Sequence, residues 1–303
     1  PICRGMILFD DRTGNGWQKW AGEHPEVIER VLKVIREKGP ISSTDFESQT
    51  ISTGWGNVKH ERLALNRLFS SGLLMVSHRE NFRRYFDLRE RILPDWDDAD
   101  ALDFKTARER LILKTISALG VAREDWISPY YYLPKTGLAE VLADLVADDR
   151  LHKVDVEGWE TPAYILPDHW EMVQSSTSGD RSPTPAALLS PFDPLVSDRD
   201  RALDLFNFDY KMESYTPIKD RKYGYFCLPI LHRGRLVGRL DPKAHRKEKR
   251  LEIKEIFLEK DVEINDVLVS ELKTCLDRFS QWHEMETVEI ADADPPELLE
   301  ALQ

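Results

Sequence analysis

Two aspartates in an unusual loop are the first residues whose type and spacing could support chemistry. The stretch Leu188–Arg199 reads LLSPFDPLVSDR, and its two prolines with Asp193 and Asp198 predict a rigid, irregular loop. Carboxylates in such a loop could activate a water or stabilise a positive charge that develops during a reaction. A structural turn, in which both aspartates bind local backbone or arginines, explains the same pattern. Asp193 and Asp198 are therefore catalytic candidates beside that alternative.

Positive charge is concentrated in two stretches of an acidic chain. The 303 residues carry a formal net charge of −12, yet residues 59–91 contain eight bases and four acids, and residues 221–250 contain ten bases and two acids. Local phosphate contacts decide affinity for DNA more than total charge does, so both stretches are candidate binding surfaces. The residues predicted to contact double-stranded DNA are Lys59, Arg62, Asn66, Arg67, Arg79, Arg83, Arg84, Arg199, Arg221, Lys222, Tyr223, Arg233 and Arg246.

The second basic stretch also interleaves aromatic residues with cations. Residues 221–225 read RKYGY, and a second group of arginines follows within residues 233–239. Aromatic rings can stack on bases while the cations contact phosphates. A basic β surface with half-buried tyrosines is the alternative. DNA contact is favoured because the positive charge continues through residues 243–250.

Composition argues against several other classes of site. Cys3, Cys227 and Cys275 are far apart without a C-x-x-C pair, which is typical of free thiols in a reducing compartment. The histidines show no ligand spacing, and no Ser/His/Asp motif or phosphate loop is recognisable, so we predict neither a metal nor a cofactor. No apolar run is long enough to span a membrane, and no signal peptide is recognisable. We expect a cytoplasmic monomer that associates with the nucleoid when bound to DNA.

The elements that must position the first basic stretch extend from Asn57 to Leu88. Asn57 is predicted to cap a helix that Gly72 ends. The apolar side of this helix carries Val58, Leu65, Leu68 and Phe69, and the polar side carries Lys59, His60, Asn66, Arg67 and Ser70. The hairpin after it consists of the strand Leu73–Val76, the turn His78–Asn81 and the return strand Phe82–Leu88. A polar helix beside a basic wing suits DNA, and an ordinary helix and hairpin with a solvated face is the alternative.

The order helix, helix, helix, hairpin occurs twice and predicts tandem winged-helix domains. In the first copy, residues 26–94, helices are expected at Pro25–Lys38 and from Ser42, ahead of the helix described above. The second copy, residues 103–173, repeats the layout with weak identity. Its third helix exposes four acids, Glu140, Asp144, Asp148 and Asp149, which would repel a duplex. We therefore predict that the second copy is a scaffold.

The pattern changes to β-strands after the linker expected at Gln174–Thr184. The strand candidates are Tyr210–Tyr215, Tyr223–Leu231, Leu236–Leu240 and Leu251–Leu258, with a hairpin turn at His232–Arg235 and a last helix capped by Asp266. These elements predict a β-rich C-terminal domain over residues 186–283, followed by a mobile acidic tail over 284–303. The predicted fold class is α+β: tandem winged-helix (helix-turn-helix) domains and then a β-rich domain with a final helix.

Four stretches of the chain resemble the YcaQ/AlkZ family of bacterial DNA glycosylases, which are built from tandem winged helices. The stretches are KGPISSTDFE, GLLMVSHRENFRRYFDLRERILPDWDD, LLSPFDPLVSDRDRALDLFNFDYKMESYTP and RKYGYFCLPILHRGRLVGRLDPKAHR. The resemblance extends from about residue 5 to residue 283, and its details favour the YcaQ branch. It implies hydrolysis of the N-glycosidic bond of an alkylated purine, including one side of an interstrand crosslink. The implied partner is damaged or crosslinked double-stranded DNA, with no cofactor.

One motif of that family is missing from the chain. The resemblance implies a catalytic Gln-x-Asp or Gln-x-Gln in an N-terminal winged helix, where the carboxylate or amide would steer water onto the anomeric carbon. None of the five glutamines here has Asp or Gln two positions later, so no catalytic residue can be carried over. The chain also begins with Pro1, and we expect residues 1–25 to be the remnant of a missing N-terminal region. A non-catalytic winged-helix transcriptional regulator is therefore kept as the alternative function.

Overall fold

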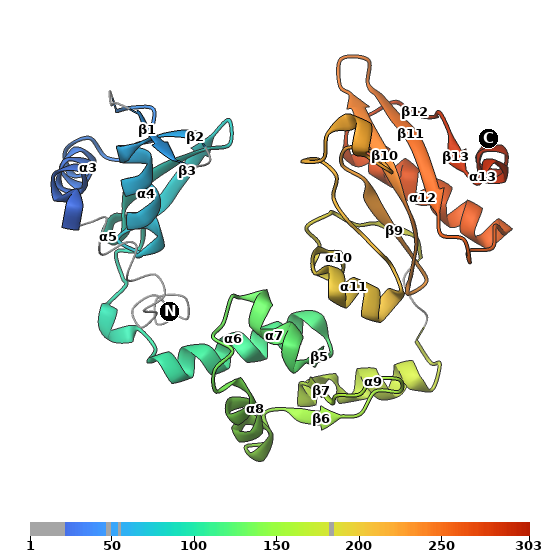
Figure 1. The fold of residues 1–303 in the computed structure, drawn as a ribbon, viewed down its shortest axis with the longest axis horizontal. Helices are drawn as coiled ribbons and strands as arrows, with labels where there is room; N and C mark the ends of the chain where they lie inside the picture. The colour runs from blue at the N-terminus through green and yellow to red at the C-terminus, as the bar shows by residue number, and fades with distance from the viewer. Residues whose placement is uncertain (1–21, 47–49, 54–55, 182–184) are drawn as a thin grey trace. The chain divides into compact units, whose positions relative to one another are not determined.

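The computed structural model describes residues 22–46, 50–53, 56–181 and 185–303, and it divides the chain into two compact units (Figure 1). The units are Pro1–Leu166 and Pro167–Gln303, and both mix helices with strands, as the predicted α+β class requires. Most of the predicted N-terminal remnant, Trp55 and the end of the predicted linker lie outside the described residues. Each unit is treated by itself below.

The first half of unit 1 places two helices against a hairpin. Its elements are α3 (Pro25–Lys38), β1 (Thr50–Thr53), β2 (Gly56–Lys59), α4 (His60–Ser70), β3 (Leu74–Glu80), β4 (Arg83–Leu88) and α5 (Arg89–Ile92). Strands β3 and β4 pair antiparallel, as do β1 and β2. Apolar residues at helical spacing on α3 and α4 form one core with Leu74, Phe86 and Leu88 of the hairpin. This core fixes the hairpin relative to α4.

Three sequence predictions in this half are wrong in detail. No helix begins at Ser42 within the described residues: the Ser42 N–H donates to Asp45, but residues 43–46 form a turn, and the chain leaves the described ranges at residue 47. Asn57 does not cap α4: it lies in β2, and the helix begins at His60. The hairpin turn is also shorter than predicted, since β3 continues to Glu80. The helix itself, α4, is confirmed with Leu65 and Leu68 buried, but Phe69, also predicted to face the core, is 37% exposed.

The second half of unit 1 has the predicted order of helices. Its elements are the 3-10 turn Asp98–Asp100, α6 (Phe104–Leu119), α7 (Glu124–Tyr130), α8 (Leu138–Ala147), β6 (His152–Val154) and β7 (Ala163–Ile165), with the unpredicted strand β5 (Ala122–Arg123). The three strands pair in the order β5-β7-β6 around a separate apolar core. The four acids of the α8 region are exposed, as expected for a scaffold that does not approach phosphates.

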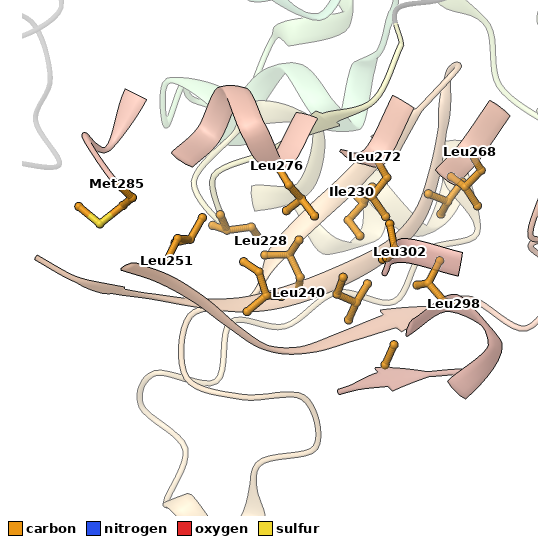
Figure 2. Packing of buried hydrophobic residues seen from close by; sticks show 14 residues of the cluster. Leu228, Ile230, Leu240, Leu251, Leu268, Leu272, Leu276, Met285, Leu298 and Leu302 are labelled. Atoms are coloured by element: carbon orange, nitrogen blue, oxygen red, sulfur yellow. The ribbon is translucent and has the colours of Figure 1, made fainter. Parts of the chain in front are cut away.

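Unit 2 contains a six-stranded mixed sheet. Its elements are the 3-10 turn Pro167–His169, α9 (Trp170–Thr177), β8 (Ala187–Leu188), α10 (Pro194–Ser197), α11 (Arg199–Phe206), the 3-10 turn Ile218–Asp220, β9 (Leu228–His232), β10 (Arg235–His245), β11 (Arg250–Leu258), α12 (Asp266–Trp282), β12 (Thr287–Ile290), β13 (Ala293–Asp294) and α13 (Pro296–Leu302). Strands β8 to β11 are antiparallel neighbours, and β12 and β13 both pair parallel to β11. Helix α12 packs on the sheet through Leu268, Leu272 and Leu276 (Figure 2).

The chain after residue 284 is part of this core, so the predicted mobile tail is wrong. Leu298 and Leu302 of α13 are buried beside α12, as Figure 2 shows, and Met285 lies in the same cluster. Acids face solvent while leucines at helical spacing face inward, which is the ordinary pattern of an amphipathic helix. The final helix of the described chain is therefore α13 and not α12.

Other expectations for unit 2 need smaller corrections. Residues 210–215 form no strand. Tyr210 is nevertheless buried, and its hydroxyl donates to the Cys227 carbonyl at 2.7 Å. The cap of α12 is Asn265, whose side chain accepts from the Leu268 N–H, and not Asp266. The predicted linker begins inside α9, which continues to Thr177. The hairpin turn at His232–Arg235 is confirmed by the pairing of those two residues.

Candidate DNA-binding surfaces

Helix α4 and the β3–β4 hairpin form the first candidate surface. Arg62 and Arg67 are exposed on α4. The guanidinium of Arg84 donates to the Asn66 side-chain oxygen at 2.7 Å, and its carbon lies 5.1 Å from the ring centroid of Phe86. The hydrogen bond and the ring contact fix Arg84 between helix and hairpin. Arg84 and Asn66 therefore order the surface, and Arg62 and Arg67 are the cations free to meet phosphates.

Three further predicted residues border this surface. Lys59 donates to the Phe46 carbonyl at 2.7 Å, so its ammonium is partly used within the protein. Arg79 donates to the Phe82 carbonyl at 3.1 Å, and Arg83 donates to the Thr44 hydroxyl at 3.2 Å. Both arginines are exposed on the hairpin, and hydrogen bonds to neutral acceptors leave their charge uncompensated. The hairpin is thus positively charged along its outer end.

The second candidate surface is the loop that contains RKYGY in unit 2. The buried Glu213 carboxylate accepts backbone N–H groups of Lys222 at 3.0 Å, Tyr223 at 2.8 Å and Gly224 at 3.2 Å. Burial would raise the pKa of Glu213, but the three N–H donors and Lys211 together lower it below its usual range. The ionised carboxylate therefore folds the loop around itself and leaves Lys222 exposed.

Buried Arg239 packs against the same loop. Its guanidinium carbon lies 4.3 Å from the Phe208 ring centroid and 4.2 Å from that of Tyr223. It also donates to the Asp209 carbonyl at 2.9 Å and to Glu259 at 2.6 Å. A planar guanidinium stacked between two rings in this way fixes Tyr223, whose half-buried ring is less available to a base than the sequence predicted.

Gly224 allows the RKYGY loop to lie in close contact with strand β10. It has φ of +143°, and a Cβ at this position would lie 2.5 Å from Asp241 Oδ2. Only glycine avoids that overlap, so the Asp241 carboxylate and the loop backbone can lie in direct contact. Arg221 is fixed nearby by donation to the Thr216 carbonyl at 2.9 Å, with its guanidinium 5.0 Å from the Tyr225 ring centroid.

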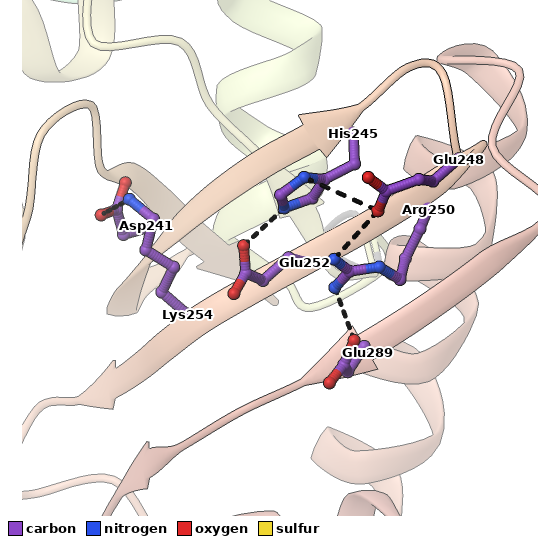
Figure 3. A network of polar contacts seen from close by, with 7 residues as sticks. All are labelled: Asp241, His245, Glu248, Arg250, Glu252, Lys254 and Glu289. Atoms are coloured by element: carbon purple, nitrogen blue, oxygen red, sulfur yellow. Dashed lines mark hydrogen bonds and ion pairs between the residues drawn. The ribbon is translucent and has the colours of Figure 1, made fainter.

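Many cations of the second basic stretch form internal ion pairs. Arg250 lies 3.2 Å from Glu248 and 2.6 Å from Glu289 (Figure 3), and Arg235 lies 2.6 Å from Asp261. Just beyond the stretch, Lys254 lies 2.9 Å from Asp241. The same network joins His245 to Glu252 across the β10–β11 hairpin. Much of the positive charge counted in the sequence is therefore compensated within unit 2, and the net charge of the stretch overstates the field at its surface.

The two predicted contacts on these hairpins differ in their surroundings. Arg233 lies in an ion pair with Glu271, with two of its nitrogens at 3.1 and 2.5 Å from the same carboxylate oxygen. Arg246 is exposed at the turn between β10 and β11, and no acid among the described residues is paired with it. Arg199 is exposed at the start of α11. Arg246 and Arg199 are consequently better placed than Arg233 to bind phosphate.

The two catalytic candidates cap helices. Asp193 accepts the Leu195 N–H at 2.9 Å, and Asp198 accepts the Arg201 N–H at 3.1 Å. Asp198 also pairs with the buried Arg201 guanidinium at 3.3 Å. These contacts supply the structural role that the sequence left open as an alternative. A catalytic role for either aspartate stays a prediction.

Sequence reasoning missed Glu213 and Arg239. Both lie in stretches that carry the family resemblance, but the hydrogen bonds of Glu213 reach nine to eleven residues along the chain, without a local spacing signal. Phe82 was also missed, although its place between an asparagine and an arginine at a hairpin tip could have drawn attention to it. Its ring is 92% exposed.

Unit 2 contains an apolar pocket of about 610 Å³. Its walls include Phe226, Phe279 and Trp282, with His283 among the few polar side chains. Burial and the charge of Arg246 lower the pKa of His283. Acids are absent from the described residues that line the pocket, so it supplies no carboxylate for activating water.

The described residues offer neither a metal-binding cluster nor a membrane-spanning helix. They contain no group of three or more His, Cys, Asp or Glu side chains arranged to bind a metal ion. Among them, no helix is both long and apolar enough to cross a bilayer.

The fold has a counterpart among solved structures. It is similar to the structure of Streptomyces sahachiroi DNA glycosylase AlkZ, with a TM-score of 0.62 and 18% identity, covering 96% of this chain and 76% of that chain. The family model described as DNA glycosylase AlkZ-like matches residues 8–282. The chain belongs to this AlkZ-like family of DNA repair glycosylases, whose substrate is DNA. The family resemblance predicted from the sequence is confirmed.

Proposed function

We propose that this protein is a DNA repair glycosylase for the N-glycosidic bond of alkylated purines, including one side of an interstrand crosslink. We propose that the 303 residues contact duplex DNA through tandem winged-helix domains and lack the catalytic motif of the family. The family match over residues 8–282 is the observation that carries the proposal. The order of α6, α7 and α8 in the second half of unit 1, and the hairpins after α4 and α8, support the winged-helix assignment. We further propose that the protein works in the cytoplasm as a monomer.

The surface of α4 and the β3–β4 hairpin supports DNA contact in the first winged helix. Arg62 and Arg67 could reach phosphates or base edges from α4, while Arg79 and Arg83 would contact the backbone from the hairpin. The RKYGY loop and Arg246 would supply contacts from unit 2. The acidic α8 region, in contrast, is proposed to be a scaffold.

Catalysis is proposed to require groups that this sequence lacks. Hydrolysis of the glycosidic bond needs a positioned water and a carboxylate or amide beside the nucleoside, because a cationic sugar develops as the base leaves. A cationic alkylpurine is already a good leaving group, so little acid catalysis is needed. The 303 residues contain no Gln-x-Asp or Gln-x-Gln, and Asp193, Asp198 and Asp241 each have structural partners. We therefore propose that this chain binds DNA and releases no base.

The experiment measures base release and binding in parallel. The chain is incubated with alkylated DNA and with DNA that contains a nitrogen-mustard-type crosslink, and abasic sites are then cleaved with alkali. A family glycosylase is the positive control. Duplex binding without strand cleavage is the expected result. Strand cleavage by this chain alone would show that catalysis lies within it, and Asp193 and Asp198 would be substituted first. Absence of duplex binding would contradict the proposed function.

A further inference from the structure

The tip of the β3–β4 hairpin has a conformation that its sequence does not favour. Glu80 pairs with Arg83, so Asn81 and Phe82 alone form the turn, with φ of +45° and +66°. A two-residue turn with positive φ at both positions matches the twist of the strands, and Asn-Gly is its preferred sequence. Asparagine adopts positive φ readily, whereas a bulky residue such as phenylalanine is strained there. Phe82 therefore occupies a position that would suit glycine better.

Burial does not offset this strain. The Phe82 side chain is 92% exposed, the largest exposed fraction among the large hydrophobic side chains of the described residues. The next ring along β4 that packs in the core is that of Phe86. An aromatic ring in water at a strained position contributes little to folding, so its presence points to a role outside the folded core.

Arginines lie next to Phe82 along the hairpin. Residues 78–84 read HRENFRR, with three arginines and Glu80 as the one acid. Arg79 donates to the carbonyl of Phe82 itself, which orders the tip, and Arg83 is exposed beside it. Glu80 lies 3.6 Å from His78. A protruding ring between uncompensated positive charges is complementary to a stack of bases flanked by phosphates.

The hairpin is rigid enough to present this ring. Leu74 and Phe86 are buried in the core of unit 1. The N–H of Ile41 donates to the Phe86 carbonyl at 3.0 Å, and the N–H of Phe86 donates back to Ile41 at 2.8 Å. The base of the hairpin is thus attached to the core, and its outer half, residues 77–83, is exposed.

We propose that Phe82 is a wedge that inserts between base pairs of the bound duplex and unstacks them. This inference rests on the proposed function, because it requires that the hairpin meets DNA. Apolar side chains that enter a base step unstack it and kink the duplex. A wedge of this kind would help the protein to separate a damaged nucleotide from its neighbours. Arg79 and Arg83 would contact the phosphates on either side of the step.

The test uses the full chain and two substitutions of the same kind. Phe82→Gly removes the ring and relieves the strain. Tyr132→Gly is the matched control, because Tyr132 is 83% exposed and has φ of +53°, but follows α7 in the half of unit 1 proposed as a scaffold. For each protein we would measure the Tm, the affinity for duplex DNA at several salt concentrations, and the fluorescence of 2-aminopurine placed along the duplex, which rises when its base is unstacked.

The wedge predicts that Phe82→Gly does not lower the Tm, weakens duplex binding about tenfold and removes the rise in 2-aminopurine fluorescence. The salt dependence of binding should not change, since no charge is lost. Tyr132→Gly should leave affinity and fluorescence as in the natural chain. Unchanged affinity and fluorescence in Phe82→Gly would overturn the wedge while the proposed function stands, and a lowered Tm would show a structural role instead. If the natural chain binds no duplex, the proposed function itself fails.

Discussion

At the residue scale, Glu213 is the best example of a side chain whose role depends on distant partners. Its carboxylate accepts three consecutive backbone N–H groups, from Lys222 to Gly224. Replacement by glutamine removes the negative charge that strengthens these hydrogen bonds. Oε2 alone lies within 3.2 Å of all three N–H groups, so an amide oxygen there can keep the contacts, but the new NH₂ group then replaces Oε1 beside the Lys222 N–H. Glu213→Gln should therefore lower the free energy of unfolding at pH 7 by about 1–3 kcal/mol. Chemical denaturation at neutral pH measures this loss.

The lowered pKa of Glu213 also predicts how the loss varies with pH. A carboxyl whose folded-state pKa is depressed stabilises the protein above its ordinary pKa of 4.5, and that stability is lost as pH falls through the folded-state value. The difference between the natural chain and Glu213→Gln should thus be constant near neutrality and shrink below about pH 4.5. Glu263→Gln, the same change at an exposed site, is the control. An equal difference at acid pH would contradict this role.

Arg233 and Arg246 make a second prediction at this scale. The carboxylate of Glu271 already neutralises Arg233, whereas Arg246 is exposed at its hairpin turn. Arg246→Ala should lower the salt dependence of duplex binding by about one unit of slope, and Arg233→Ala should change it by much less. Binding titrations at four or more salt concentrations measure both slopes. A larger effect of Arg233→Ala would show that its ion pair opens on DNA.

The sequence could identify these residues as charged and aromatic, but it could not assign their partners. From the sequence, Asp193 and Asp198 could be either catalytic or structural. Their structural role is to cap helices α10 and α11, which begin directly after them. The charge count from the sequence treated Arg233 as an unpaired cation, because its partner Glu271 is 38 residues away along the chain. Charge counts therefore predicted where basic side chains cluster, and they overstated how many are available to DNA.

At the scale of elements, periodicity was most reliable where a helix buries one face. Helix α8 follows the predicted range because its leucines recur at helical spacing and are buried. Capping signals were less reliable. The pair Ser42 and Asp45 makes the expected hydrogen bond in a turn, without a helix after it within the described residues. Local hydrogen bonds of this kind compete with helix formation, so the signal does not identify a helix by itself.

The C-terminal segment shows how a count of acids can mislead. The acids after residue 284 predicted a mobile tail, but Leu298 and Leu302 are buried against the rest of unit 2. Removal of a fully buried leucine leaves a cavity as well as losing apolar contact. Leu298→Ala should lower the free energy of unfolding by about 2–5 kcal/mol. A thermal or denaturant melt of the full chain measures it.

The control for this prediction is an exposed leucine in the same unit. Leu203 lies on α11 with 49% of its surface exposed, so Leu203→Ala should change stability by about 0.5 kcal/mol or less. If Leu298→Ala lowered the free energy of unfolding as little as Leu203→Ala, the segment after α12 would contribute little to the stability of unit 2. The packing of α13 in unit 2 would then need revision.

At the scale of the whole molecule, a family that acts on DNA is represented by a chain with an unevenly distributed charge. The AlkZ-like family makes DNA the substrate, while the net charge of −12 opposes approach to phosphates. Binding must therefore rely on local surfaces, of which α4 with the β3–β4 hairpin is the one whose exposed arginines are least compensated. The fold class and the family followed from the sequence. The availability of each cation required the structure.

The most direct test of this account compares two fourfold substitutions that remove the same total charge. One replaces the exposed cations Arg62, Arg67, Arg79 and Arg83 by alanine, and the other replaces the exposed cations Arg110, Lys114, Lys135 and Lys153 of the proposed scaffold. The measurement is the slope of the logarithm of duplex affinity against the logarithm of salt concentration. The first variant should lose about three to four units of slope and the second close to none, since each lost phosphate contact removes about 0.9 units. Equal slopes in the two variants would contradict the account, because DNA would then respond to the total charge and not to this surface.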